Sequence, residues 1–273
     1  MNERVNLPFY NSKYIQIDCI NLECKVNIME YASQKAAQII KRAKENGVTL
    51  RLIGGLAIRQ HCGELAFCDR EYGDIDLVGL SHQAKAVMET MKELGYQENN
   101  FYTMLSGGTH LLFEKPDSKD HIDVFLDILP MEHDIDLRGR LDIEENTISV
   151  SDLLISKLII KEMNEKDYRD IITIVKDIPL GHEDIPETIN IDYIAALCSQ
   201  NWGLNLDVLQ AIDACMAFLK TYHFDEPTSQ ELTTKFLEIQ QAIEYHPKSL
   251  KWMIRSRVGK RFAWRNEVEL QNE

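Results

Sequence analysis

The sequence predicts an α/β (α+β) fold in which a small mixed sheet with flanking helices is followed by a helical C-terminal domain. Between about residues 28 and 130, helical patterns alternate with strand-like patterns of period two. From residue 151 onward the apolar spacing is helical almost throughout. We therefore expect a domain of residues 1–178, with its core in 28–178, and a helical domain of residues 185–273. The stretch 179–186, which contains Pro and Gly, is the expected linker.

The first strand is bounded by glycines. Helical spacing predicts a helix over residues 28–45, and an apolar stretch predicts a strand over 49–53. Gly54-Gly55 then permits a tight turn with no Cβ in the way of a ligand, and a helix begins near Ala57. Such a turn exposes backbone N–H groups, so Gly54 and Gly55 are candidate phosphate-binding residues. Arg59 follows one helical turn later and is a further candidate, with an ordinary surface arginine as the alternative.

Alternation and turn residues predict the remaining elements. Pro116 and the polar residues after it separate two strands, which favours a hairpin. Ser81, Ser151 and Asp152 are candidate helix caps. In chain order, the expected elements are an edge strand at 14–19, a strand at 74–80, a helix at 81–94, strands at 110–114 and 121–129, and helices at 151–163, 167–176, 207–222 and 229–245.

Acidic residues gather on two of these strands. One strand places Asp74 and Asp76 on the same face, and the second strand of the hairpin places Asp123 and Asp127 on one face, so Asp127 is an alternative to Asp123. Two carboxylates about 4 Å apart repel by roughly 4 kcal/mol at an effective dielectric constant near 20, so three together need a cation. Oxygen ligands without a suitably placed His or Cys favour Mg²⁺ or Mn²⁺ over zinc. This donor set indicates phosphoryl or nucleotidyl transfer.

The order of these motifs resembles that of the nucleotidyltransferase superfamily. Within it, the chain is most similar to lincosamide-type antibiotic nucleotidyltransferases and to the nucleotidyltransferase toxins of abortive-infection systems. The resemblance implies transfer of NMP from an NTP donor to a hydroxyl acceptor, with Asp74 and Asp76 holding the metal and Asp123 completing the catalytic site. The likeness covers roughly residues 30–178, and its matching stretches are Leu52-Ile53-Gly54-Gly55, Gly73-Asp74-Ile75-Asp76-Leu77, Glu93-Leu94-Gly95-Tyr96 and Ile122-Asp123-Val124.

The toxin-like branch also carries an L-x-x-K-L helix followed by K-D and D-I dipeptides. These correspond here to residues 154–158, 166–167 and 170–171, so the resemblance implies that Lys157 or Lys166 contacts the triphosphate. Lys157 lies among apolar residues, where a lysine that extends its ammonium to solvent is the alternative. Many relatives have Ser or Thr after the Gly-Gly pair, whereas this chain has Leu56-Ala57, which leaves phosphate binding to backbone groups.

Histidine and cysteine residues receive ordinary interpretations. His110 and His121 lie on strands near the acidic residues and are candidate bases or acceptor contacts, but hydrogen-bonded strand histidines are the preferred interpretation. The six cysteines form no C-x-x-C pair, and we expect reduced thiols. No apolar run approaches the about 20 residues needed to span a bilayer, and the polar start lacks a signal-peptide pattern, so a cytoplasmic location is expected.

Charge constrains the acceptor. A formal net charge of −14 argues against broad nonspecific nucleic-acid binding, which needs clustered Lys and Arg, and favours a small cationic or neutral acceptor. One C-terminal run without acidic residues is the exception. It is either an RNA or triphosphate contact or, as the net charge favours, a basic segment docked on the acidic body with its tryptophans packed inside. Its members are Lys248, Lys251, Arg255, Arg257, Lys260, Arg261 and Arg265, interleaved with Trp252, Phe262 and Trp264.

Three functions therefore remain open at this point. The first is a metal-dependent nucleotidyltransferase that modifies a small molecule such as an antibiotic, and the acidic charge favours it. The second is a toxin-type nucleotidyltransferase that acts on tRNA or protein, which the L-x-x-K-L likeness and the basic C-terminal run favour. The third is a noncatalytic nucleotide-binding module, favoured by the missing Ser or Thr after the glycines.

Overall fold

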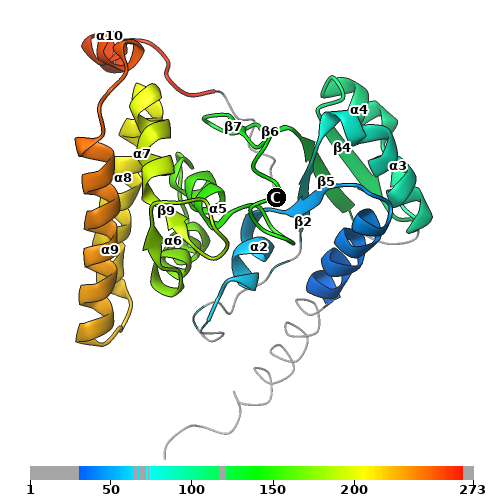
Figure 1. Cartoon of the computed structure of the whole chain (residues 1–273), viewed down its shortest axis with the longest axis horizontal. Coiled ribbons are helices and arrows are strands. Elements are labelled where there is room, and N and C mark those ends of the chain that lie inside the picture. Colours follow the sequence, from blue (N-terminus) through cyan, green and yellow to red (C-terminus); the bar gives the residue numbers. More distant parts are fainter. Residues whose placement is uncertain (1–30, 64–66, 68–71, 73, 117–120, 267–273) are drawn as a thin grey trace, which may run out of the picture.

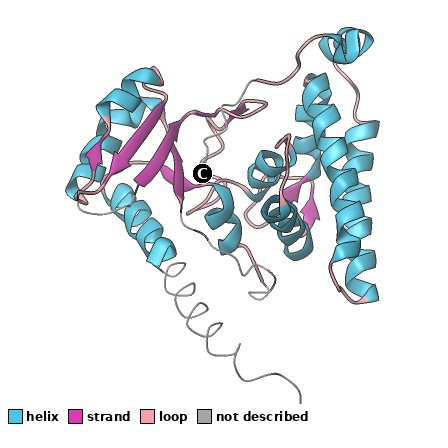
Figure 2. Ribbon diagram, turned by 180° about the vertical axis from the view of Figure 1, so that it is seen from behind, coloured by secondary structure: helices cyan, strands magenta, loops and turns pink. Residues whose placement is uncertain are grey.

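The computed structural model describes residues 31–63, 67, 72, 74–116 and 121–266. It confirms the predicted fold class, since a mixed sheet with flanking helices precedes a group of C-terminal helices. Figures 1 and 2 show the sheet with α3 and α4 at one end of the molecule and α5 to α9 at the other, with α2 between them. The edge strand expected at 14–19 lies outside the described residues. No helix in the described part is long and apolar enough to cross a membrane.

The main sheet has five strands in the order β1-β2-β5-β4-β3. Only β2 and β5 run parallel, and the other neighbouring pairs are antiparallel, including the predicted β4–β5 hairpin. Because parallel strands cannot be joined by a tight turn, the chain crosses through α3, β3, α4 and β4 before it returns as β5. The strands are β1 (Leu50–Leu52), β2 (Ile75–Gly79), β3 (Gln97–Glu98), β4 (His110–Glu114) and β5 (His121–Leu126).

Helices cover this sheet through a continuous apolar core. Residues 31–45 are helical, as expected, and bury Ile39 in the same core as the fully buried strand residues Leu77 and Val124. The predicted helix at 81–94 is a short 3-10 turn, Ser81–Gln83, followed by α3 (Ala84–Glu93), which buries Met91. The other helices at this end are α2 (Gly54–Gln60) and α4 (Asn100–Leu105), and α4 was not predicted.

The strand expected at 121–129 breaks at Asp127. This residue has a φ of +67°, a left-handed conformation that no strand continues through. β5 therefore ends at Leu126, and a separate two-stranded ribbon follows, β6 (Ile128–Leu129) with β7 (Ile135–Asp136). The prediction that Asp127 shares the strand face of Asp123 is wrong for this reason.

The predicted helices of the second half are present, but their caps and bounds differ: the helix expected at 151–163 ends at Leu158, and the one expected at 207–222 begins at Trp202 and ends at Phe218. Ser149 rather than Ser151 or Asp152 caps α5 (Val150–Leu158), because its hydroxyl accepts from the Asp152 backbone N–H. A capping box of Asn164 and Asp167 starts α6 (Glu165–Asp177) earlier than expected. The remaining elements are β8 (Leu180–Gly181), β9 (Ile189–Asn190), α7 (Ile191–Gln200), α8 (Trp202–Phe218), a 3-10 turn (Leu219–Thr221), α9 (Glu226–Tyr245), α10 (Leu250–Val258) and a 3-10 turn (Gly259–Arg261).

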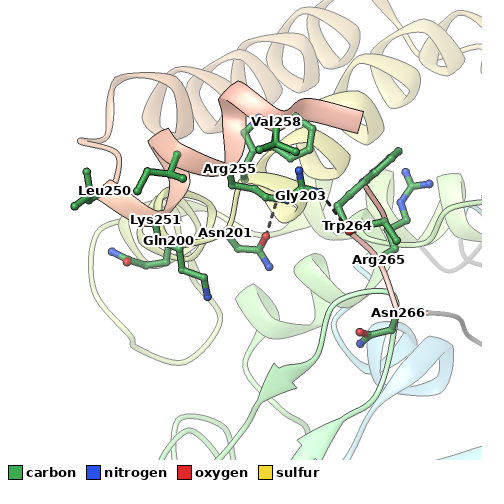
Figure 3. A pocket seen from close by; sticks show the side chains of 13 residues that line it. Gln200, Asn201, Gly203, Leu250, Lys251, Arg255, Val258, Trp264, Arg265 and Asn266 are labelled. Atoms are coloured by element: carbon green, nitrogen blue, oxygen red, sulfur yellow. Dashed lines mark hydrogen bonds between the residues drawn. The ribbon is translucent and has the colours of Figure 1, made fainter. Parts of the chain in front are cut away.

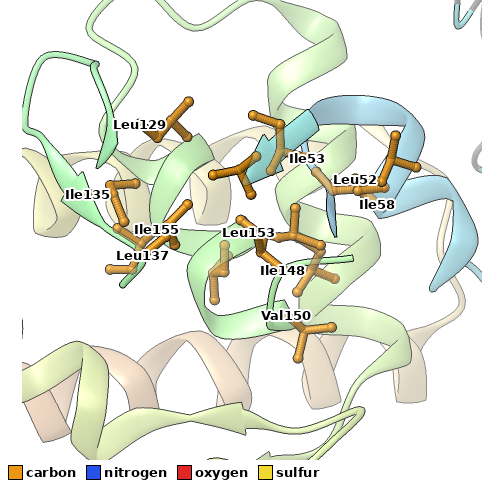
Figure 4. Close-up of a cluster of buried hydrophobic side chains, with 14 of the residues drawn as sticks. Leu52, Ile53, Ile58, Leu129, Ile135, Leu137, Ile148, Val150, Leu153 and Ile155 are labelled. Carbon is orange, nitrogen blue, oxygen red and sulfur yellow. The ribbon is translucent and has the colours of Figure 1, made fainter. Parts of the chain in front are cut away.

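Helix α5 joins the two ends of the molecule. It contacts α2 on one side and α6, α7 and α8 on the other. Figure 4 shows the buried cluster at this junction, where side chains from β1, α2, the β6–β7 ribbon and α5 meet. Ile53, Leu137, Ile148 and Leu153 are each at most 4% exposed there. The residues that begin the glycine turn are thus packed against the helical part of the chain.

The expectation of reduced cysteines is wrong for Cys62. Cys62 is disulfide-bonded, whereas Cys198 and Cys215 are free and buried. Burial raises the pKa of the Cys198 thiol to about 12. This keeps the thiol protonated and unreactive at neutral pH. The prediction of reduced thiols therefore holds for Cys198 and Cys215.

The basic C-terminal segment is docked on the protein. Buried Asp207 of α8 accepts hydrogen bonds from Arg265 at 2.7 Å and from Trp264 Nε1 at 3.2 Å, and it also contacts His133 at 2.8 Å. Burial alone would raise the pKa of Asp207, but these hydrogen bonds outweigh it and lower the pKa. Arg255 donates to the backbone carbonyls of residues 259, 262 and 263. Arg255 and Arg265 of this segment are therefore used within the fold.

We predict that Asp207→Ala destabilises the fold by about 3 kcal/mol, because it leaves buried polar partners unpaired. Equilibrium urea unfolding measures the loss. Asp213→Ala is the matched control, since Asp213 lies on the same helix and is exposed. Equal stability of the two variants would show that the Asp207 contacts do not hold the C-terminal segment.

Candidate active site

The central parallel strand pair sets the geometry of the acidic residues. In the β2–β5 register, Asp76 lies directly opposite Asp123. Asp74 immediately precedes β2, with its side chain 66% exposed and its Oδ1 3.7 Å from His121 Nε2. The structure therefore brings Asp76 and Asp123 together and places Asp74 at the adjacent, solvent-facing strand end.

The glycine turn lies against Asp76. Gly54 has a φ of +70°, and a Cβ added there would stand 3.1 Å from Asp76 Oδ2. The backbone N–H of Ile53 donates to the Asp76 carbonyl at 2.9 Å, which ties the end of β1 to β2. Two features of position 54 thus favour glycine: its left-handed conformation and the close approach of the Asp76 carboxylate.

Asp76 carries the strongest electrostatic perturbation among these carboxylates. Burial, and then the negative charges of Asp123 and Asp74, raise its pKa to about 6. The positive charges of His121 and Lys157 oppose this effect without cancelling it. Excess negative charge in a partly buried place is the environment that a bound cation would relieve.

Asp123 is engaged by a histidine. Its Oδ1 lies 2.6 Å from Nε2 of His110, which pairs with Phe125 across the β4–β5 hairpin. The other ring nitrogen of His110 lies 3.3 Å from the hydroxyl of Tyr102 on α4. The preferred interpretation of His110 as a hydrogen-bonded strand histidine is thus correct, but its partner is the candidate catalytic residue.

Asp127 does not join this group. Its side chain accepts a hydrogen bond from the backbone N–H of Ser81 at 2.9 Å. Partial burial alone would raise the pKa of Asp127, but the hydrogen bonds with Ser81 outweigh it and lower the pKa. The left-handed turn at Asp127 directs it to this cap. The structure therefore selects Asp123 over its alternative.

The two candidate lysines lie in different settings. The ammonium of Lys157 is held between two buried carboxylates, 2.9 Å from Asp167 and 3.0 Å from Asp170. Burial alone would lower the pKa of Lys157, but the charges of Asp170 and Asp167 outweigh it and raise the pKa. Lys166 is exposed on the first turn of α6. Lys157 therefore does not extend to solvent as the alternative interpretation required.

Arg59 lies on the same helical face as Gly55, which precedes it by four residues on α2. Its Nε is buried and has no hydrogen-bond partner within the described residues. Side chains on a helix lean toward its N-terminus, so Arg59 leans toward the glycine turn. An unpartnered buried guanidinium nitrogen is unusual, because such groups normally form hydrogen bonds.

The donor set suits a hard cation. Within the described residues, no three His, Cys, Asp or Glu side chains are already grouped as ligands for a metal ion. Mg²⁺ is usually bound through one or two carboxylates, with substrate phosphates and water completing its octahedron. The Asp76–Asp123 pair and its excess negative charge fit that mode of binding.

A separate cavity lies at the docked C-terminal segment. It has a volume of about 770 Å³ and is lined by α10, the start of α8 and residues 263–266. Figure 3 shows Arg255 and Trp264 beside it, and Trp264 packs so closely on Gly203 that an added Cβ would lie 2.8 Å from the indole. This is the docked arrangement that the net charge favoured, although Phe262 remains 71% exposed.

Comparison with known proteins gives distant likenesses. The sequence matches no protein-family model and no curated protein. The solution structure of the antibiotic-resistance factor ANT(2'')-Ia is 13% identical, with a TM-score of 0.36, over 69% of this chain and 95% of that one. The crystal structure of an antigenic nucleotidyltransferase-like protein from Paracoccidioides brasiliensis is 12% identical, with a TM-score of 0.42, over 80% of this chain and 94% of that one. Because both likenesses are so distant, the function of the chain is inferred from the geometry of its own site.

We predict that Asp76→Asn stabilises the metal-free protein at about pH 8. The folded-state pKa of about 6 lies above the ordinary 3.8, so wild type loses stability as the pH rises through about 6. The advantage of the variant should vanish below about pH 4, where both side chains are neutral. Thermal unfolding in a chelator, with Asp213→Asn as control, measures the difference. A pH-independent difference would contradict the raised pKa.

Proposed function

We propose that the chain is a metal-dependent nucleotidyltransferase that moves NMP from an NTP to an acceptor hydroxyl and releases pyrophosphate. One observation carries the proposal: the glycine turn of Gly54 meets a pair of facing carboxylates, Asp76 and Asp123, on neighbouring parallel strands. A phosphate-binding turn beside paired carboxylates is what a metal–triphosphate complex requires.

Asp76 and Asp123 would hold Mg²⁺ or Mn²⁺, and Asp74 would add a carboxylate from the exposed strand end. The bound ion would supply charge neutralisation at the phosphates and a lowered pKa for the attacking hydroxyl. This assignment agrees with the raised pKa of Asp76, because neighbouring negative charges are a cause of the shift.

The reaction balances as an in-line displacement. The acceptor oxygen forms a bond to the α-phosphorus, and the bond from that phosphorus to the bridging oxygen breaks. Pyrophosphate leaves with the electron pair, and the acceptor proton passes to a carboxylate. Asp123 is our candidate for that base.

Backbone groups and cations near the turn would bind the triphosphate. Gly54 and Gly55 would present their N–H groups, and Arg59 would offer its buried Nε, which has no hydrogen-bond partner within the described residues. Lys157 would act at longer range, since two aspartates neutralise it while its charge still lowers the pKa of Asp76. Lys166 is exposed on α6 and is the other lysine that we propose for contact with the triphosphate.

We propose a small-molecule acceptor, cationic or neutral. The net charge of −14 disfavours nucleic acid. Two cations of the basic C-terminal run, Arg255 and Arg265, are consumed by contacts within the protein. That leaves a smaller basic surface for RNA than the sequence alone suggests.

We predict that NTP binding by calorimetry depends on Mg²⁺ or Mn²⁺ and is lost in Asp76→Asn and in Asp123→Asn. Asp127→Asn is the control, because Asp127 lies on the same segment but faces Ser81. Transfer rates, followed by pyrophosphate release in acceptor screens, should fall by at least about 10²-fold in the first two variants. Full metal-dependent binding in both would refute the proposed function.

We predict that Gly54→Ala weakens metal–NTP binding at least about tenfold, since its methyl group would push on Asp76. Gly47→Ala is the matched control, because Gly47 has a φ of +69° and open space around it. Both variants should lose about 1–2 kcal/mol of stability from the left-handed conformation. Equal NTP affinity in both variants would show that the glycine turn does not take part in nucleotide binding.

A further inference from the structure

We infer that His110 and Tyr102 are positioning residues that orient Asp123 toward the metal and the acceptor. The inference rests on the proposed function and extends it to two residues that no motif identifies. Neither residue would touch the substrate. Their action would pass through the carboxylate of Asp123.

The hydrogen bonds form a directed chain. A carboxylate only accepts, so Nε2 of His110 carries the proton that it shares with Asp123 Oδ1 at 2.6 Å. In the tautomer that donates from Nε2, Nδ1 is an acceptor, and the phenol of Tyr102 lies 3.3 Å from it as the donor. Tyr102 therefore selects the tautomer of His110 that can donate to Asp123.

The imidazole is held in place by two aromatic rings. It stacks on Phe125 with the ring centroids 4.1 Å apart, and Tyr102 meets it edge-on at 4.9 Å. The His110 side chain is only 12% exposed, and that of Asp123 is 19% exposed. A ring fixed in this way restrains the carboxylate, so one oxygen is occupied and Oδ2 remains available to the site.

The neighbouring histidine lacks these restraints. His121 is 51% exposed, and its Nε2 lies 3.7 Å from Asp74, beyond hydrogen-bond length. The side chain of His110 is therefore mostly buried and hydrogen-bonded, whereas that of His121 is exposed and makes only a longer contact. Of these two, His110 is the one placed to fix a carboxylate before a ligand arrives, and outer partners of metal ligands commonly contribute 10- to 100-fold in metal affinity.

The test is Mn²⁺ affinity by calorimetry, in the presence of a nonhydrolysable NTP, for wild type and His110→Leu, His110→Gln and Tyr102→Phe. His110→Leu should weaken binding about 10- to 100-fold. His110→Gln should recover most of it, because its amide can donate to Asp123. Tyr102→Phe, which loses only the hydroxyl, should fall between. His223→Leu, an exposed histidine on the far helical part, is the control.

The outcomes separate the two proposals. If His110→Leu or Tyr102→Phe binds Mn²⁺ as tightly as wild type, or His110→Gln binds no better than His110→Leu, the positioning role is wrong and the proposed function stands. If wild type binds no Mn²⁺, or Asp76→Asn binds it equally well, both fail. If a His110 variant does not melt cooperatively, Tyr102→Phe, which removes only the hydroxyl oxygen, decides the positioning role alone.

Discussion

The parallel pairing of β2 with β5 is the constraint on which the site depends. It places Asp76 opposite Asp123 although the two lie far apart in the chain, and no local turn can do this. The crossover through α3 and β4 is what allows the two strands to run in the same direction. A register shift of one residue would send Asp123 to the opposite face and put an apolar side chain in its place.

The pairing has an electrostatic cost, which the surrounding residues reduce only in part. Asp76 has a raised pKa, while Lys157 is held nearby by two aspartates of its own. The glycine turn lies against the same carboxylate, so the backbone that we propose for phosphate binding is adjacent to the acidic pair. Helix α5 carries Lys157 and packs against α2, which couples the helical part of the chain to the site.

Local patterns predicted β1, β2, β4, β5 and the aspartates, but long-range geometry decided which of the aspartates lie together. Period-two alternation placed Asp123 and Asp127 on one face, yet Asp127 ended the strand in a left-handed conformation, which an aspartate adopts more often than most residues but still only rarely. The pairing of His110 with Asp123 depends on the hairpin register, which the long connecting turn left open. The only available signal for this register was the position of Pro116, from which the residues of both strands can be counted outward. The contacts of Lys157 depend on the packing of α5 on α6, which no sequence spacing defines.

The most direct test of the account is the position of the metal and the nucleotide. Crystals soaked with Mn²⁺ and a nonhydrolysable NTP would show the ion by its anomalous scattering. The account predicts a peak within about 2.5 Å of carboxylate oxygens of Asp76 and Asp123, with the triphosphate against the turn at Gly54. An ion and nucleotide bound elsewhere, or a peak that contacts neither aspartate, would contradict it.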